Sequence, residues 1–295
     1  MIALLRDKPL DFPVGEKYSY TNSGYFLLGT IIEKVSGKTY ADFLQENIFT
    51  PLNMKNTGYD NPLFIINNRA SGYTRQAGKY LNAAYMDMSV PFAAGAMYST
   101  TGDLLLWDQA LYTEKLVSQK SLDEMFTPNK NGYGYGWGIS SKFGKQQISH
   151  GGSIFGFSTD ISRFPTEKLT FVVLSNLQGS PAGSIANDLA AIVFGAKYEI
   201  PQERTEIAVS PKILEQYVGS YQLLPNVVFS ILLENGKLFG QVADQQKVSL
   251  VAETETKFFS RDVAVTITFN SDAQGKVTGM TFFQGGANLA APKIK

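Results

Sequence analysis

The first strong pattern along the chain is a helical one over residues 22–36. Apolar side chains recur there at steps of three and four residues, which predicts a helix with one buried stripe made of Tyr25, Leu28, Ile32 and Val35. Thr21 or Asn22 can cap the start of this helix, because their side chains accept hydrogen bonds from its first N–H groups. Gly37 can end it in the left-handed conformation.

Further helices and a long loop region complete the first part of the chain. Thr39 can cap a second helix over residues 40–48, and two more helices are expected, one capped by Thr101 and one over residues 118–126. Residues 53–96 are rich in Asn, Gly and Tyr, and loops of this length often line a site. The aromatic loop residues either form a binding wall or cover the surface; they are Tyr73, Tyr80, Tyr85, Tyr98, Tyr133 and Tyr135.

From Gly134 onward the pattern changes to short segments typical of strands. Four of them are separated by turn residues, at 135–139, 147–149, 157–164 and 169–175. A helix over residues 184–194 can pack back on the resulting sheet. Residues 1–200 are therefore expected to form an α/β (α+β) domain with an antiparallel sheet.

A different texture follows a charged, proline-bounded linker over residues 201–211. Residues 212–295 alternate short apolar segments with tight turns. The expected strands are 217–221, 227–233, 238–242, 248–251, 258–259, 263–269 and 277–283. This pattern predicts an all-β antiparallel sheet or a small barrel.

Composition removes several kinds of chemistry. The 295 residues include no Cys and one His, which excludes thiol nucleophiles, disulfides and multi-histidine metal sites. No metal or cofactor is expected. Acidic and basic residues balance at 26 each, so nothing directs the chain to nucleic acid. No stretch approaches the roughly 18 apolar residues that a membrane span requires.

Two short motifs carry the candidate chemistry. Tyr20-Thr21-Asn22 precedes the first helix, and His150-Gly151-Gly152 lies in the strand-rich part. They resemble the Tyr-x-Asn and the Lys-Thr-Gly or His-x-Gly elements of the serine β-lactamase and penicillin-binding-protein-like hydrolases, a superfamily of class C β-lactamases, DD-peptidases and esterases. The segment 217–221, Tyr-Val-Gly-Ser-Tyr, resembles the lipocalin-like C-terminal domain often attached to these hydrolases.

The resemblance implies a role for each residue of the first motif. Tyr20 would be the phenol that moves a proton between nucleophile and leaving group, and Asn22 would orient the family's lysine and bind a substrate amide. A phenol ionises near pH 10, so it acts as a base only beside a cation that lowers its pKa.

The second motif would supply the strand edge that lies against the substrate. Gly151 and Gly152 let the backbone approach closely. By resemblance, the N–H of Ser153 would be one oxyanion donor, and His150 would bind near the substrate carboxylate or leaving group. We expect Tyr20 and His150 to face a shared cleft.

The third element of the superfamily, Ser-x-x-Lys on a helix, is missing, because no Ser in the sequence has Lys three positions later. The resemblance therefore implies an N-terminally truncated domain whose first strands and nucleophile-bearing helix lie outside this sequence. Substrates would be a small amide or ester, a peptide or a β-lactam, and the parent family is usually periplasmic or extracellular. The chain alone is expected to be inactive.

Two alternatives stay open at this point. The chain can be a catalytically silent penicillin-binding-like protein that binds a ligand or a partner, with self-association or a complementing chain covering the exposed sheet edge. A replacement nucleophile is the other alternative, and Ser153 and Ser23 are its candidates.

Overall fold

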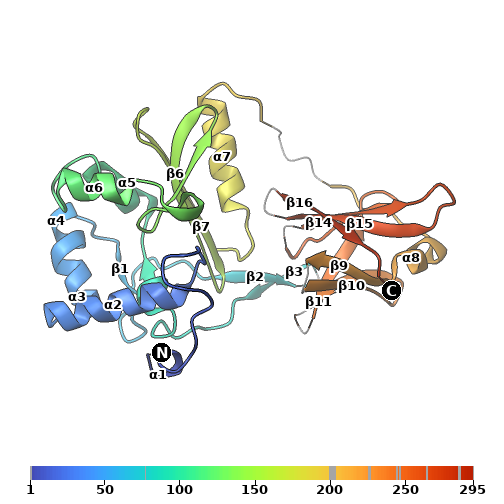
Figure 1. Ribbon diagram of the computed structural model, residues 1–295, viewed down its shortest axis with the longest axis horizontal. Coiled ribbons are helices and arrows are strands. Elements are labelled where there is room, and N and C mark those ends of the chain that lie inside the picture. The colour runs from blue at the N-terminus through green and yellow to red at the C-terminus, as the bar shows by residue number, and fades with distance from the viewer. Residues whose placement is uncertain are drawn as a thin grey trace. The chain divides into compact units, whose positions relative to one another are not determined.

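The computed structural model (Figure 1) describes residues 2–76, 78–198, 204–224, 227–243, 245, 247–263, 265–284 and 287–294. Its contacts divide the chain into two compact units, Met1–Gly72 with Ala83–Glu199, and Tyr73–Asn82 with Ile200–Lys295. Each unit has hydrophobic clusters of its own. Part of the linker expected at 201–211, residues 201–203, lies outside the described residues.

The described helices of the first unit surround its sheet. They are α1 (Ile2–Leu5), α2 (Asn22–Ser36), α3 (Tyr40–Leu44), the π-helical η1 (Gln45–Phe49), α4 (Thr50–Leu52), η2 (Phe92–Ala94), α5 (Thr101–Ala110), α6 (Gln119–Met125), η3 (Lys130–Gly132) and α7 (Ala182–Val193). Helix α2 has the predicted bounds, with Thr21 as its N-cap and Gly37 left-handed at its end (φ 70°). The second predicted helix continues through η1 and α4 to Leu52, beyond its expected end at residue 48.

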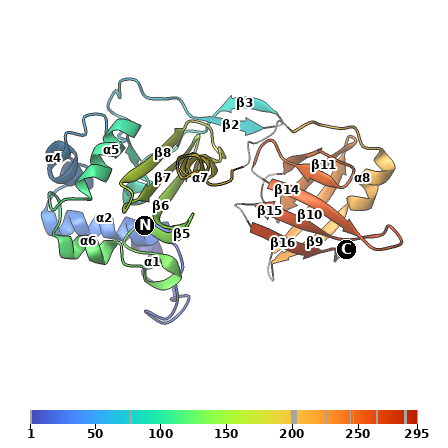
Figure 2. The same ribbon diagram turned by 90° about the horizontal axis from the view of Figure 1, so that it is seen from above.

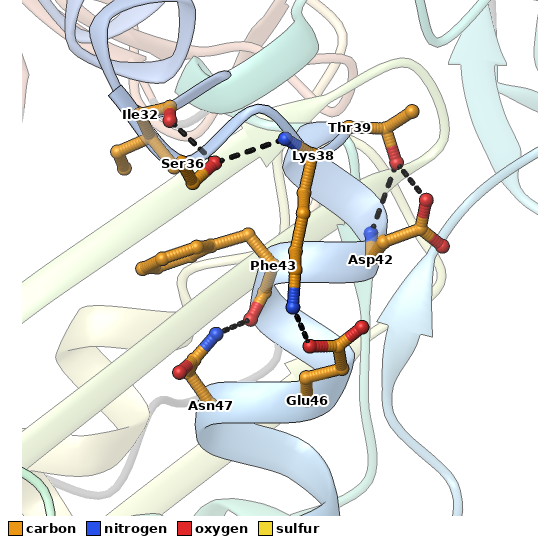
Figure 3. A network of polar contacts seen from close by, with 8 residues as sticks. All are labelled: Ile32, Ser36, Lys38, Thr39, Asp42, Phe43, Glu46 and Asn47. Atoms are coloured by element: carbon orange, nitrogen blue, oxygen red, sulfur yellow. Dashed lines mark hydrogen bonds and ion pairs between the residues drawn. The ribbon is translucent and has the colours of Figure 1, made fainter. Parts of the chain in front are cut away.

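Polar contacts fix the junction between α2 and α3 (Figure 3). The Ser36 hydroxyl donates back into α2 at 2.7 Å and accepts from the Lys38 N–H at 3.2 Å. Thr39 caps α3 by accepting from the Asp42 N–H at 3.1 Å, which confirms its predicted role. Lys38 also forms an exposed ion pair with Glu46.

The apolar stripe predicted to be buried on α2 is only partly covered, because Tyr25 and Ile32 are half-buried and the other two residues are exposed. Leu28 and Val35 are 52% and 83% exposed, and the helix packs through Gly29 instead. Phe92 and Ala93 lie so close to Gly29 that a Cβ there would be 2.3 Å from the Ala93 Cβ. The missing side chain thus decides which face of α2 meets the rest of the unit, and the stripe prediction was wrong for Leu28 and Val35 for this reason.

The sheet of the first unit has helices on both faces (Figure 2). Its antiparallel strands are ordered β5 (Gly138–Lys142), β6 (Lys145–Ile154), β7 (Phe157–Phe164) and β8 (Leu169–Ser175). Neighbouring residues of β7 point to opposite faces. Arg163 meets Asp108 of α5, whereas Phe164 packs 4.9 Å from Phe194 at the end of α7. The predicted α/β arrangement is confirmed. A short ladder of β1 (Gly58–Tyr59) and β4 (Met97–Tyr98) lies apart from this sheet.

The second unit is an eight-stranded antiparallel, nearly closed barrel, which confirms the all-β prediction. Its hydrogen-bonded order is β16-β15-β14-β13-β12-β11-β10-β9, and the Ile294 N–H donates to the Ser220 carbonyl at 2.8 Å to bring the two ends together. The strands are β9 (Gly219–Leu224), β10 (Val227–Glu234), β11 (Lys237–Val242), β12 (Val248–Ala252), β13 (Lys257–Phe259), β14 (Val265–Ser271), β15 (Val277–Gln284) and β16 (Ala287–Pro292).

Two details of this unit differ from the sequence-based expectation. Tyr217 ends helix α8 (Pro211–Tyr217) instead of opening a strand, and its ring stacks 4.0 Å from that of Phe269. Strand β16 was not anticipated from the sequence. The hairpin of β2 (Tyr73–Gln76) and β3 (Lys79–Asn82) groups with this unit.

Candidate functional site

The first motif lies at the start of α2. Tyr20 comes just before the capping residue Thr21, and its hydroxyl donates to Oδ1 of Asn22, the first residue of the helix, at 3.4 Å. Half of the Tyr20 side chain (51%) is exposed. In the described part of the chain no cation is recorded in contact with its hydroxyl.

His150 lies on β6, on the sheet face opposite α7. Its partner on β7 is Ile161. The next residue, Ser162, faces α7, because Gln147 bonds both to Ser162 and to Asn187 of α7. Successive residues of a strand point to opposite faces, so Ile161 and its partner His150 face away from α7. The centre of its ring is 6.0 Å from that of Tyr20. The structure therefore brings the two predicted residues together, although they are 130 positions apart in sequence (150 minus 20).

Both ring nitrogens of His150 have partners. Nδ1 is 2.7 Å from the carbonyl oxygen of Gly151, and Nε2 is 2.9 Å from the hydroxyl of Tyr133. A carbonyl oxygen can only accept, so Nδ1 carries the hydrogen of the neutral ring and Nε2 accepts from Tyr133.

Tyr133 is the residue of this site that the sequence did not single out. Its ring centre lies 5.4 Å from Tyr18 and 6.1 Å from Tyr20, and its hydroxyl is 3.5 Å from that of Tyr25. Burial is the main cause that raises the pKa of Tyr133 far above its usual value, and burial also raises the pKa of Tyr18. These phenols are therefore neutral hydrogen-bonding groups at physiological pH. The only sequence signal was the abundance of tyrosines in loops.

The glycine motif forms an open strand edge. Strand β5 pairs with β6 only as far as Ser149, so within the described residues the outer edge of β6 from His150 onward has no strand partner. Gly152 is exposed, and a Cβ there would lie 2.5 Å from Oγ1 of Thr159 on β7. An exposed edge of this kind offers backbone hydrogen-bonding groups to an extended ligand.

Asp160 lies on the opposite sheet face, across from Gly151 in the β6–β7 pairing. Burial raises the pKa of Asp160, whereas the Ser162 hydroxyl, which donates to the Asp160 carboxylate at 2.7 Å, and the nearby His150 lower that pKa.

Among the residues that the structure describes, no three His, Cys, Asp or Glu side chains gather closely enough to hold a metal ion. The polar groups that meet around Tyr20 and His150 are phenols, an amide, an imidazole and backbone groups.

The two candidate replacement nucleophiles lack an activating partner. Ser23 bonds through its backbone N–H to Thr21, and Ser153 pairs with Ser158 across β6–β7. Within the described ranges, neither hydroxyl has a recorded hydrogen bond to a lysine or a histidine. A serine nucleophile needs such a base.

Sequence comparisons identify the family. The family described as Beta-lactamase matches residues 1–194, and the chain belongs to this family. A second family, described as a domain of unknown function (DUF3471), matches residues 203–292. Penicillin-binding protein 4* of Bacillus subtilis (strain 168) is 32% identical over 289 residues, which cover 88% of the chain and 62% of that relative. The chain therefore spans less than two thirds of this relative's length.

Solved structures agree with the assignment. The octameric penicillin-binding protein homologue from Pyrococcus abyssi is similar over 98% of the chain and 69% of its own, with a TM-score of 0.60 and 24% identity. The D-amino acid amidase from Ochrobactrum anthropi SV3, complexed with L-phenylalanine amide, is similar over 61% of the chain and 58% of its own, with a TM-score of 0.52 and 27% identity. The resemblance read from the two motifs is confirmed at the level of the superfamily. In the described residues, no helix combines the length and apolar character needed to cross a membrane.

Proposed function

We propose that the surface around Tyr20, Asn22 and His150 is one side of an acyl-transfer site that acts on amide or ester bonds, as in serine β-lactamases, penicillin-binding proteins and D-amino acid amidases. The observation that carries this proposal is the 6.0 Å approach of the Tyr20 and His150 rings beside the open edge of β6. Family membership supports the class of reaction.

Each residue has a role in this proposal that its contacts support. The Asn22 amide oxygen accepts from the Tyr20 hydroxyl at 3.4 Å, and in this proposal its amide N–H donates to a substrate carbonyl. Gly151, Gly152 and Ser153 present the strand edge along which the acyl group lies, with the Ser153 N–H as an oxyanion donor. His150 binds the polar end of the substrate.

The polypeptide of 295 residues carries no Ser-x-x-Lys, and we propose that it binds substrates without being acylated by them. Tyr20 as a base requires a neighbouring cation, and the nucleophile must come from a hydroxyl beside it. Removing a nucleophile leaves only binding and oxyanion contributions to catalysis.

The outer edge of β8 supports a role for additional polypeptide. Residues 170–174, Thr-Phe-Val-Val-Leu, form the nearly continuous apolar run that is typical of strands flanked on both sides. Yet β8 ends the sheet in the described residues, and apolar side chains of α7 nearby are exposed, such as Ile192 (51%) and Val193 (56%). We propose that a strand-bearing segment, from another copy or another chain, covers this edge.

The alternative function is a catalytically silent ligand- or partner-binding protein, and the same uncovered edge of β8 favours it. The barrel offers less support, because its interior is filled: Tyr221, Ile231 and Ile267 are fully buried. The lipocalin-like resemblance of this unit stays a prediction.

A fluorescent penicillin tests the proposal in two measurements on the purified chain. Fluorescence anisotropy reports reversible binding, and a denaturing gel reports covalent acylation. We expect saturable binding, a loss of affinity of at least tenfold in Asn22→Ala and His150→Ala, and no label on the gel. Tyr198→Phe is the matched control, because Tyr198 is half exposed and lies beside the turn at Lys142, at the far end of β6.

The outcomes separate the parts of the proposal. Rapid, saturable labelling on the gel contradicts the absence of a nucleophile. Absence of reversible binding contradicts the half-site itself. Binding that is equally strong in the His150 variant, the Asn22 variant and the control places the ligand elsewhere on the chain and favours the silent binding protein.

A further inference from the structure

The loop that carries Tyr133 is held in one conformation by its own backbone. The Tyr133 N–H donates to the Lys130 carbonyl at 3.2 Å, and its carbonyl accepts from the Asn129 N–H at 3.0 Å. The Gly134 N–H donates to the Trp137 carbonyl at 2.8 Å. Both peptide groups of Tyr133 are thus fixed, so the direction in which its Cα–Cβ bond leaves the backbone is fixed as well.

Two glycines are required by this conformation. A Cβ on Gly134 would lie 2.3 Å from the Met125 carbonyl oxygen, and a Cβ on Gly132 would lie 2.9 Å from the Ile139 carbonyl oxygen. Gly132 also has a φ of +67°, in the left-handed region that favours glycine. The Gly-Tyr-Gly segment is therefore built to bring the chain close to its neighbours and to leave Tyr133 as the side chain that reaches the site.

The Tyr133 hydroxyl joins three elements of the site. It contacts the Tyr25 hydroxyl of α2 at 3.5 Å and Nε2 of His150 at 2.9 Å, and His150 in turn contacts the Gly151 carbonyl through Nδ1. The carbonyl fixes the direction of this relay: Tyr25 donates to Tyr133, Tyr133 to His150, and His150 to Gly151. The raised pKa of Tyr133 agrees with a hydroxyl that keeps its proton.

We propose that Tyr133 is a positioning residue for His150: by donating to Nε2, it holds the ring in the Nδ1–H tautomer that the Gly151 carbonyl selects. The hydrogen bond made by one ring nitrogen decides where the proton of a histidine lies. The Gly151 carbonyl and the Tyr133 hydroxyl together determine which nitrogen of His150 is an acceptor, and the two side chains meet a ligand as one unit. That this positioning matters for substrates rests on the proposed function, whereas the tautomer of His150 is a property of the chain itself.

The single histidine makes this proposal directly measurable. In a chain labelled with ¹⁵N-histidine, NMR at about pH 8, above the usual histidine pKa of ~6.5, reports the protonation of each ring nitrogen. We expect hydrogen on Nδ1 and an acceptor Nε2 in the wild-type chain. Tyr133→Phe keeps the ring and removes the hydroxyl, so the Nε2 resonance should shift and the Nε2–H tautomer should increase. Tyr135→Phe, at an exposed position two residues away, is the matched control and should match the wild type.

Three results would overturn the proposal: a wild-type proton on Nε2, an unchanged spectrum in Tyr133→Phe, or an equal change in Tyr135→Phe. If Tyr133→Phe fails to fold, Tyr25→Phe removes the other hydroxyl of the relay and should shift the Nε2 resonance in the same direction, less strongly. An unchanged Nε2 resonance in Tyr25→Phe would then contradict the proposal. A chain that binds no penicillin but shows the Tyr133-dependent tautomer contradicts the proposed function and leaves the positioning role intact.

Discussion

The buried ion pair between Asp108 and Arg163 offers the sharpest test of how the first unit is held together. The Arg163 side chain is 1% exposed and that of Asp108 is 6% exposed, with Nε and Oδ1 2.5 Å apart. The guanidinium lies over three aromatic rings, at 5.0 Å from Tyr112, 5.2 Å from Phe126 and 5.9 Å from Trp137. Its Nη1 has no recorded hydrogen-bond partner, so Asp108 is the main compensation for the buried charge.

Asp108→Asn keeps the shape of this contact and removes the counter-charge. Leaving one buried charge without its partner typically costs about 3–5 kcal/mol. With a urea dependence of about 2 kcal/mol per molar for a unit of this size, the unfolding midpoint should fall by about 1.5–2.5 M. The double variant Asp108→Leu with Arg163→Met removes both charges and should recover most of this loss.

Urea unfolding followed by tryptophan fluorescence measures this effect in the correct unit, because both tryptophans, Trp107 and Trp137, belong to it. The control is Glu46→Gln, which breaks the Lys38–Glu46 pair whose side chains are 45% and 53% exposed. An exposed pair contributes about 0–1 kcal/mol, so its midpoint should move by at most about 0.5 M. Equal shifts for the buried and the exposed pair, or a double variant no more stable than Asp108→Asn, would refute the reasoning.

Two further predictions concern the strands of the site. Gly152→Ala should lower the free energy of unfolding by about 1–3 kcal/mol in thermal unfolding, because its Cβ would lie 2.5 Å from Oγ1 of Thr159. Gly151→Ala is the control and should cost less, because the nearest atom to its Cβ would lie at 3.5 Å. Equal losses of stability in the two variants would contradict this reasoning. Burial raises the pKa of Asp160, so the folded chain keeps the carboxyl proton to a higher pH than the unfolded chain does. The contribution of Asp160 to the free energy of unfolding therefore falls as the pH rises from about 3.8 through the folded pKa. Asp160→Asn should therefore stabilise the chain more at about pH 7.5 than at about pH 4 in urea titrations, and a pH-independent difference would argue against it.

Local signals in the sequence were sufficient for most elements. Helix α2 begins and ends where Thr21 and Gly37 predict, and the four strands of the first sheet lie near their expected positions. Caps, turns and alternation are determined by neighbouring residues, so one sequence is enough to find most of them. The cap of α5 was misplaced by one residue, because Thr100 and not Thr101 accepts from the Asp103 N–H. Strand β16 was missed because Asn288 and Pro292 interrupt its apolar pattern.

The candidate site was only partly visible in the sequence for a related reason. Tyr20 and His150 were found because short motifs surround them, and their rings do meet. Tyr133 was not singled out, because its role depends on contacts with Tyr25 and His150 that are distant in sequence. Nothing near Tyr133 distinguishes it from Tyr135, which is exposed.

The exposed apolar residues of α2 and the edge of β8, unpaired among the described residues, belong to the same unit of the chain. A stripe of apolar residues at helical spacing is normally buried, yet Leu28 and Val35 are exposed, whereas barrel residues such as Ile231 and Ile267 are fully buried. Exposed apolar side chains also occur on α7, such as Ile192 and Val193, and at Leu174 of β8, and these elements belong to the first unit. We therefore propose that additional polypeptide bound to that unit would bury these side chains, as proposed above for the edge of β8.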